Sequence, residues 1–286
     1  NDSGLTPLHL VCTTKNRSMA DYLLSRGAEI HGRTDGGETP LHKAAYYGRL
    51  AVLELLLERG AQVDARDNCE ETPLHEATHA LDKVAVKTTE LLLDAGADPN
   101  VRDKWGRTPL DLVALKGMAA TAGRLLAGGA EHSLRSAIGL GKMALVDELM
   151  EQDPGAAQKR DRWGQTPLHW AADAGNPEVV RYLVQHGAEV NARDDHGETP
   201  LHEATFDENV EAMEILLSGG AAVDAADDRG MTPLYWAVSW RRTAAVKCLL
   251  AYGADPSIKS KKGWTPLDAA KTQEIRDLLR QHGAVR

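Results

Sequence analysis

Residues 161–194 read DRWGQTPLHWAADAGNPEVVRYLVQHGAEVNARD, and this pattern predicts two short helices followed by an extended finger. Thr166 stands before Pro167, which suits an N-cap hydroxyl followed by a proline at the first helical position. Asn176 and Pro177 start a second helix in the same way. Its apolar residues recur at helical spacing, at Val179, Val180, Leu183 and Val184. The stretch therefore predicts a helix–turn–helix unit with one apolar side.

The same letters recur along the whole chain. Thr-Pro-Leu begins at Thr6, Thr39, Thr72, Thr108, Thr166, Thr199, Thr232 and Thr265. Successive spacings are 33, 33, 36, 58, 33, 33 and 33 residues. Histidine follows the leucine at His9, His42, His75, His169 and His202. A fixed period of this length indicates a repeat protein.

The chain resembles the ankyrin-repeat family, because Thr-Pro-Leu-His-x-Ala returns at a period of 33 residues over nearly its whole length. The resemblance implies an all-α solenoid of stacked helix–turn–helix units with β-hairpin fingers. It implies about nine repeats, one of them degenerate. A single unit of this kind cannot bury its own apolar faces, so each must stack against its neighbours.

The repeats depart from their period at two places. The gap of 58 residues after Thr108 fits a degenerate repeat in HSLRSAIGLGKMALVDELM, residues 132–150, which lacks the finger before it. We therefore expect four repeats in residues 1–130 and five in residues 131–286, in a continuous array that bends near residues 128–134. The 36-residue unit carries three extra residues around positions 81–87, which predicts a lengthened loop or helix there.

Residues 75–79, His-Glu-Ala-Thr-His, match the signature of zinc peptidases, in which two histidines one helical turn apart hold the metal and the glutamate activates water. The histidine at this repeat position recurs in four other units, however, and Phe206 stands where a second unit would need its second histidine. We therefore interpret His75 as architecture and expect no catalytic residue, metal or cofactor. A zinc-dependent hydrolase using His75, Glu76 and His79 is the enzyme alternative.

Composition excludes some classes of protein. The net charge of −9 and pI of about 5.7 disfavour a protein that neutralises nucleic-acid phosphates. The longest apolar stretches, such as residues 51–57, are far shorter than the roughly 20 residues of a membrane span. Three scattered cysteines imply no disulfide framework. We expect a cytoplasmic monomer that inserts in no membrane.

The resemblance implies binding of another protein or peptide along a concave face lined by first helices and finger tips. Aromatic side chains gather at these variable positions in the second half of the chain: Trp163, Trp170, Phe206, Trp236 and Trp240. Tryptophan is prominent among binding hot spots, so we predict an adaptor that uses these residues as anchors. Glu203, Asp207 and Glu208 would then select a basic peptide, and Lys43, Tyr46 and Tyr47 form a weaker second patch.

Two other interpretations stay open. The tryptophans could instead cover neighbouring helices and fingers and so contribute to stability alone. Alternatively, Trp236, Trp240 and Trp264 could form an aromatic cage for a methylated or other quaternary cation, as in certain chromatin-reading ankyrin arrays.

Overall fold

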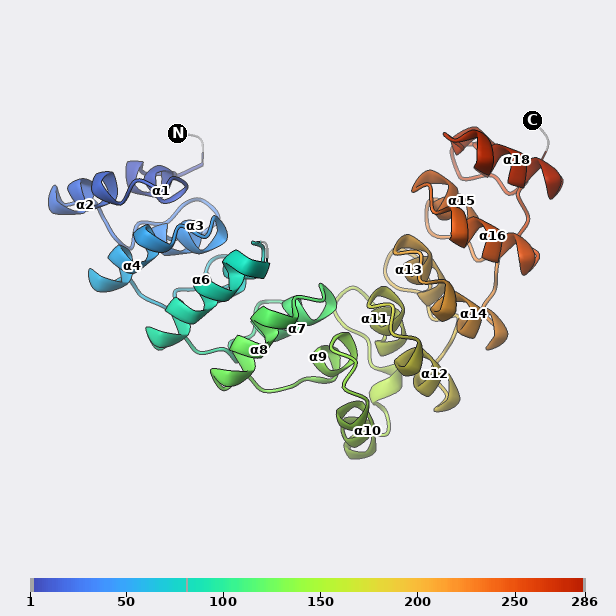
Figure 1. The fold of residues 1–286 in the computed structure, drawn as a ribbon, viewed down its shortest axis with the longest axis horizontal. Helices are drawn as coiled ribbons and strands as arrows, with labels where there is room; N and C mark the ends of the chain where they lie inside the picture. The colour runs from blue at the N-terminus through green and yellow to red at the C-terminus, as the bar shows by residue number, and fades with distance from the viewer. Residues whose placement is uncertain (1–2, 81, 285–286) are drawn as a thin grey trace. The chain divides into compact units, whose positions relative to one another are not determined.

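The computed structural model describes residues 3–80 and 82–284, which form eighteen α-helices and one short 3₁₀ helix (Figure 1). The first helices of the repeats are α1 (Pro7–Cys12), α3 (Pro40–Tyr46), α5 (Pro73–Ala77), α7 (Pro109–Leu115), α9 (Leu134–Gly139), α11 (Pro167–Asp173), α13 (Pro200–Phe206), α15 (Pro233–Ser239) and α17 (Pro266–Ala269). The second helices are α2 (Arg17–Ser25), α4 (Leu50–Glu58), α6 (Asp82–Asp94), α8 (Ala119–Ala127), α10 (Met143–Gln152), α12 (Pro177–Gln185), α14 (Val210–Ser218), α16 (Thr243–Ala251) and α18 (Gln273–Gln281). The 3₁₀ helix η1 is Ala156–Gln158. No helix in the described ranges has the length and apolarity that a membrane crossing requires.

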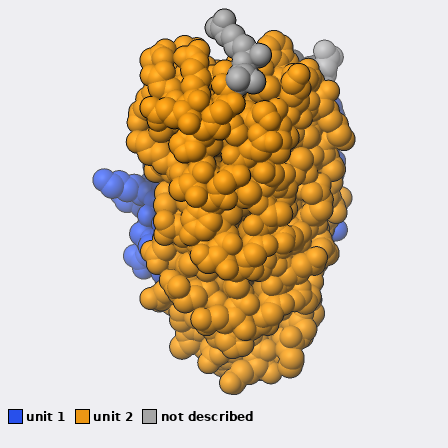
Figure 2. Space-filling model, turned by 90° about the vertical axis from the view of Figure 1, so that its right-hand side faces the viewer, with its two compact units in different colours: residues 1–136 blue, residues 137–286 orange. Residues whose placement is uncertain are grey.

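The chain divides into two compact units, residues 1–136 (unit 1) and residues 137–286 (unit 2) (Figure 2). Within unit 1, α1, α3, α5 and α7 pack in chain order, and α2, α4, α6 and α8 pack in a second row. Unit 2 repeats this scheme with α11, α13, α15 and α17 in one row and α10, α12, α14, α16 and α18 in the other. We call the surface formed by a unit's first helices and finger tips its inner face, and that formed by its second helices its outer face.

Five of the fingers are turns closed by an aspartate. In the finger at residues 194–198, the Asp194 N–H donates to the Glu198 carbonyl at 2.9 Å. The Asp194 carboxylate accepts the N–H groups of His196 and Glu198 at 2.9 and 2.8 Å. The same arrangement occurs at Asp67, Asp103, Asp161 and Asp227. No β-strand occurs in residues 3–80 and 82–284. The expected β-hairpin fingers are thus present as turns.

The recurring threonine and histidine cap the first helices α1, α3, α5, α11 and α13 and tie each of them to the next repeat. In α13, the Thr199 N–H donates to His202 Nδ1 at 3.1 Å, and His202 Nε2 lies 3.2 Å from the Met231 carbonyl of the following finger. A backbone N–H can only donate, so Nδ1 is the acceptor, Nε2 carries the hydrogen and the ring is neutral. Burial, which disfavours the charged ring, lowers the pKa of His202 to about 4.

The two departures from the period have simple structural forms. Residues 128–133 alone join α8 to α9, whereas residues 186–199, which include a finger, join α12 to α13. The degenerate repeat keeps its cap, because the Ser133 and Ser136 hydroxyls each accept the other's backbone N–H, at 3.1 and 2.9 Å. The three-residue insertion lengthens the second helix of its unit, α6, to 13 residues, whereas α4 has 9. Leu81, where the insertion begins, lies outside the described residues.

Candidate functional site

His75 of the zinc-peptidase signature serves the repeat architecture. Its Nδ1 accepts the Thr72 N–H at 3.1 Å, and its Nε2 lies 3.1 Å from the Arg107 carbonyl. These contacts match those of His202, except that the acceptor lies 32 residues away instead of 29 because of the insertion. Both ring nitrogens are therefore already engaged in hydrogen bonds of the repeat architecture.

His79 lies beyond the helix that carries His75, because α5 ends at Ala77 and Thr78 is its C-cap. The exposed His79 ring lies instead beside Tyr46, with the ring centroids 5.7 Å apart. The structure thus does not assemble the zinc pair of the enzyme alternative.

Glu76 belongs to an acidic cluster, and among the described residues a cluster of this kind is found in each unit. In unit 1, carboxylate oxygens of Asp67, Glu71 and Glu76 lie within 4.8 Å of one another. Unit 2 has the corresponding cluster at the same repeat positions, formed by Asp194, Glu198 and Glu203. Burial, followed by the nearby carboxylate of Glu71, raises the pKa of Glu76 to about 8. The Glu76 carboxyl is therefore largely protonated at neutral pH.

Unit 2 carries an aromatic pocket of about 480 Å³ on its inner face. Phe206, Trp236 and Trp240 form its aromatic wall; the other lining residues are Glu198, Arg229, Met231, Ser239 and Lys271. The Phe206 ring meets Trp240 edge to face at 5.0 Å and Trp236 at 6.3 Å, an arrangement that favours aromatic contact. Trp240 is 55% exposed, whereas Trp236 is only 9% exposed. Trp236 thus forms the floor, and Trp240 is the side chain most open to a partner.

Trp236 and Trp170 are held by the fingers of their own repeats. The Trp236 indole N–H donates to the Asp227 carboxylate at 3.2 Å, and the Trp170 indole N–H donates to Asp161 at 3.3 Å. Trp236 also packs edge to face on His202, with 5.4 Å between centroids. These two residues therefore contribute to the fold as well as to the inner face, and the sequence alone could not separate the two roles.

The aromatic cage that the sequence allowed is not assembled. Trp264 is 55% exposed but does not line the pocket of Trp236 and Trp240. Its carbonyl instead accepts the Ser260 N–H at 2.9 Å and closes the last finger. Arg229 lies 5.4 Å above the Trp236 ring, so a cation already occupies that aromatic face. Trp163, a half-buried finger residue, also lies outside the pocket lining.

Tyr46 and Tyr47 form an exposed aromatic pair at the end of α3 in unit 1. Their rings meet edge to face at 5.0 Å, and they are 44% and 43% exposed. They stand at the repeat positions of Phe206 and Trp240. Lys43, the third residue of the predicted patch, is paired with Glu38 at 2.6 Å. Unit 1 thus presents an aromatic patch at the corresponding repeat positions.

Two of the three carboxylates expected to select a basic peptide are engaged within unit 2. Glu203 accepts a hydrogen bond from Gln165 Nε2 at 3.0 Å. Burial, followed by Asp173 and other nearby carboxylates, raises its pKa to about 8. Glu208 accepts the Ala244 N–H at the start of α16, at 2.7 Å. Asp207 is the exposed carboxylate of the three.

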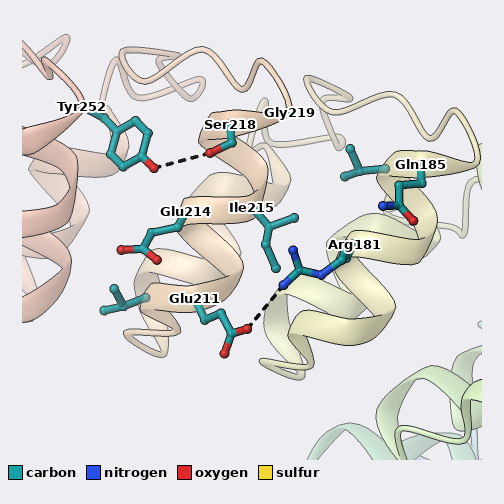
Figure 3. Close-up of a pocket in the computed structure, with 10 residues that line it drawn as sticks. Arg181, Gln185, Glu211, Glu214, Ile215, Ser218, Gly219 and Tyr252 are labelled. Atoms are coloured by element: carbon teal, nitrogen blue, oxygen red, sulfur yellow. Dashed lines mark hydrogen bonds and ion pairs between the residues drawn. The ribbon is translucent and has the colours of Figure 1, made fainter.

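A larger cavity of about 810 Å³ lies on the outer face of unit 2, between α12, α14 and Tyr252 (Figure 3). Arg181 crosses toward Glu211, with 3.5 Å between their charged atoms, and Tyr252 reaches the Ser218 hydroxyl at 3.4 Å (Figure 3). This cavity forms between the second helices of consecutive repeats, so the repeat pattern of the sequence does not predict it. Its lining is mixed and lacks a cluster of aromatic anchors.

Comparison with known proteins agrees with the repeat structure. Residues 1–67, 134–227 and 207–285 match the family described as "Ankyrin repeats (3 copies)", and residues 69–104 match "Ankyrin repeat". The chain belongs to the ankyrin-repeat family, and its fold is that of a protein-interaction scaffold.

Two relatives match over short segments. The chain is 39% identical over 59 residues to the 2-5A-dependent ribonuclease of Mus musculus, which covers 21% of this chain and 8% of that protein. It is 40% identical over 51 residues to the 26S proteasome non-ATPase regulatory subunit 10 of Homo sapiens, which covers 18% of this chain and 23% of that protein. The chain therefore matches only a minor part of either relative.

Proposed function

We propose that the chain is an adaptor that binds another protein through the inner face of unit 2, with Trp240 and Phe206 as the main anchors. The observation that carries this proposal is the aromatic pocket, in which a 55% exposed tryptophan stands against a second aromatic ring. Anchors that fill such pockets supply most of the free energy of many protein interfaces. A single apolar side chain of a partner would fit between Trp240 and Lys271.

The earlier alternatives receive less support. The basic peptide stays a prediction, and it now depends mainly on Asp207, since Glu203 and Glu208 are engaged within unit 2. A hydrolase would need His75 free of its two architectural hydrogen bonds. A reducing compartment such as the cytoplasm would suit the three free thiols of Cys12, Cys69 and Cys248.

The test compares two exposed aromatic residues on opposite faces of unit 2. The protein, with a photocrosslinking residue in place of Ser239, would first be used to capture a partner, and the affinity of that purified partner would then be measured. Trp240→Ala should weaken binding about thirtyfold or more, because loss of a hot-spot aromatic costs about 2 kcal/mol or more. Tyr252→Ala on the outer face, where Tyr252 is 44% exposed, should leave the affinity unchanged.

Stability provides the necessary control. The Trp240 ring contacts Phe206 edge to face, so Trp240→Ala should lower the free energy of unfolding by about 1 kcal/mol at most. Equal affinity of the two variants for the partner would refute an inner-face site.

A further inference from the structure

We infer that the partner segment is acidic and carries one large apolar side chain: the apolar side chain enters the aromatic pocket and the carboxylates meet the cations beside it. This inference rests on the proposed function and specifies the chemistry of the same site. The partner that we infer has the opposite charge to the basic peptide that the acidic residues of α13 and its following loop predicted.

The part of the chain that begins at Arg229 has the opposite charge to the chain as a whole. Residues 229–286 contain eleven lysines and arginines against four aspartates and glutamates, whereas the whole chain contains 33 against 42. Two of these cations, Arg229 and Lys271, line the pocket itself. The Lys261 N–H donates to the Arg229 carbonyl at 2.8 Å, which places the next finger beside them.

These cations differ in how well they are neutralised. Arg229 is paired with Asp227 and Glu198 at 2.9 and 3.0 Å, so its charge is largely compensated. The side chains of Lys261 and Lys271 are exposed and make no hydrogen bond or ion pair with the residues that the structure describes. The exposed anion nearest in sequence to the aromatic wall is Asp207, which follows Phe206. The charges without a partner that line the pocket or lie in the adjacent finger are therefore those of Lys271 and Lys261, and both are positive.

Arg241, beside the pocket, has a strained backbone conformation. It follows Trp240 directly and has φ of +60°, the left-handed region that favours glycine. Glycine stands at the corresponding positions Gly48 and Gly175, with φ of +59° and +61°. The exposed Arg241 side chain has no partner among the described residues, so no contact within the fold explains why an arginine is held in this conformation. Strained residues of this kind cluster at binding sites.

A protein segment fits these features better than a nucleic acid. The edge-to-face rings bound a pocket for one side chain and offer no row of parallel surfaces for successive bases. Asp173, at the end of α11, and the exposed Asp207, which follows α13, carry carboxylates that would repel a phosphate chain that continued along the inner face. An acidic peptide needs to reach only the basic side of the pocket.

The test uses random twelve-residue peptides displayed on phage and selected on the whole chain. The selected peptides should have a net negative charge and share a Leu, Ile, Phe or Trp. Synthetic copies should lose about tenfold or more in affinity on Trp240→Ala or Lys271→Glu. Lys142→Glu is the matched control: it makes the same charge change at an exposed position of unit 2, the N-cap of α10, and should leave affinity unchanged.

The possible outcomes separate the inference from the proposed function. Basic or neutral peptides that still require Trp240 would overturn the acidic partner and leave the inner-face site intact. Peptides indifferent to Trp240→Ala would overturn both. A labelled 15-nucleotide oligo(dT) should not bind; if it binds and Trp240→Ala abolishes the binding, the partner is nucleic acid and the inference is wrong.

Discussion

Arg241 shows how one residue can oppose stability. An L-residue in the left-handed region is strained by contact between its Cβ and the following carbonyl oxygen, at a cost of roughly 1–2 kcal/mol. Glu208 has the same φ of +60° in the preceding repeat, but its carboxylate recovers part of this cost by accepting the Ala244 N–H at 2.7 Å. Arg241 has no such contact among the described residues.

Arg241→Gly should therefore raise the free energy of unfolding by about 1 kcal/mol, because glycine adopts this φ without strain. The same variant should bind the selected acidic peptides more weakly. Urea denaturation and a peptide titration measure the two effects. Glu208→Gly is the control, since the lost hydrogen bond should offset its relief of strain. A destabilised Arg241→Gly variant would show that the arginine serves the fold.

The raised pKa of Glu203 should make the stability of the chain depend on pH. Its pKa is raised to about 8 in the folded chain, so it favours folding fully below the ordinary pKa of 4.5 and loses that contribution as the pH rises through 8. Glu203→Gln keeps a carbonyl acceptor for Gln165 and cannot ionise. Above pH 8 it should be more stable than the parent by roughly 2 kcal/mol, allowing for its partial exposure.

Urea denaturation of both proteins between pH 4 and 9 tests this prediction, and the two curves should converge near pH 4. The control is Glu211→Gln on the outer face, where the exposed carboxylate contacts Arg181 and should give only a small difference. A difference between the Glu203→Gln variant and its parent that does not change with pH would contradict the burial of that carboxylate.

At the scale of single helices, the sequence predicted most of what the structure contains. Thr-Pro-Leu-His predicts a helix start because threonine and histidine satisfy N–H groups of the first turn and proline lacks one. These interactions are local, so they can be predicted without knowing which other helices pack nearby. The degenerate repeat predicted in residues 132–150 contains α9 and α10 as its two helices. The sequence allowed either a longer loop or a longer helix at the insertion near residue 81, and the structure has the longer helix α6.

The candidate site was only partly predictable, because it depends on contacts between elements. The aromatic residues at variable positions were visible in the sequence, but not which of them share a pocket. Helix α17 ends at Ala269, and Thr272 then caps α18, which leaves Lys271 in the connection beside the pocket. Lys271 lines the pocket because α17 ends as early as Ala269, and the repeat pattern does not specify where this helix ends.

At the scale of the molecule, a repeat protein distributes its stability among neighbours, since each repeat contacts only the adjacent ones. Leu216 in α14 and Leu53 in α4 are both fully buried, one in each unit. Truncating a buried leucine to alanine costs about 2–5 kcal/mol. We expect this loss to be felt mainly within the unit that carries the substitution.

Amide hydrogen exchange tests this expectation. Leu216→Ala should accelerate exchange in α13 to α16 and leave α3 and α4 unchanged, whereas Leu53→Ala should give the reverse pattern. Equal acceleration across the whole chain would mean that the two units unfold as one cooperative body.

The histidine contact between repeats bears on how such a chain can evolve. The histidines reach main-chain carbonyls of residues as different as Glu38, Arg107 and Met231. A junction that recognises only the polypeptide backbone is indifferent to the neighbour's side chain at that point. A duplicated or transplanted repeat would therefore find a compatible hydrogen-bond acceptor in its new neighbour. Its surface residues would remain free to change and to bind new partners.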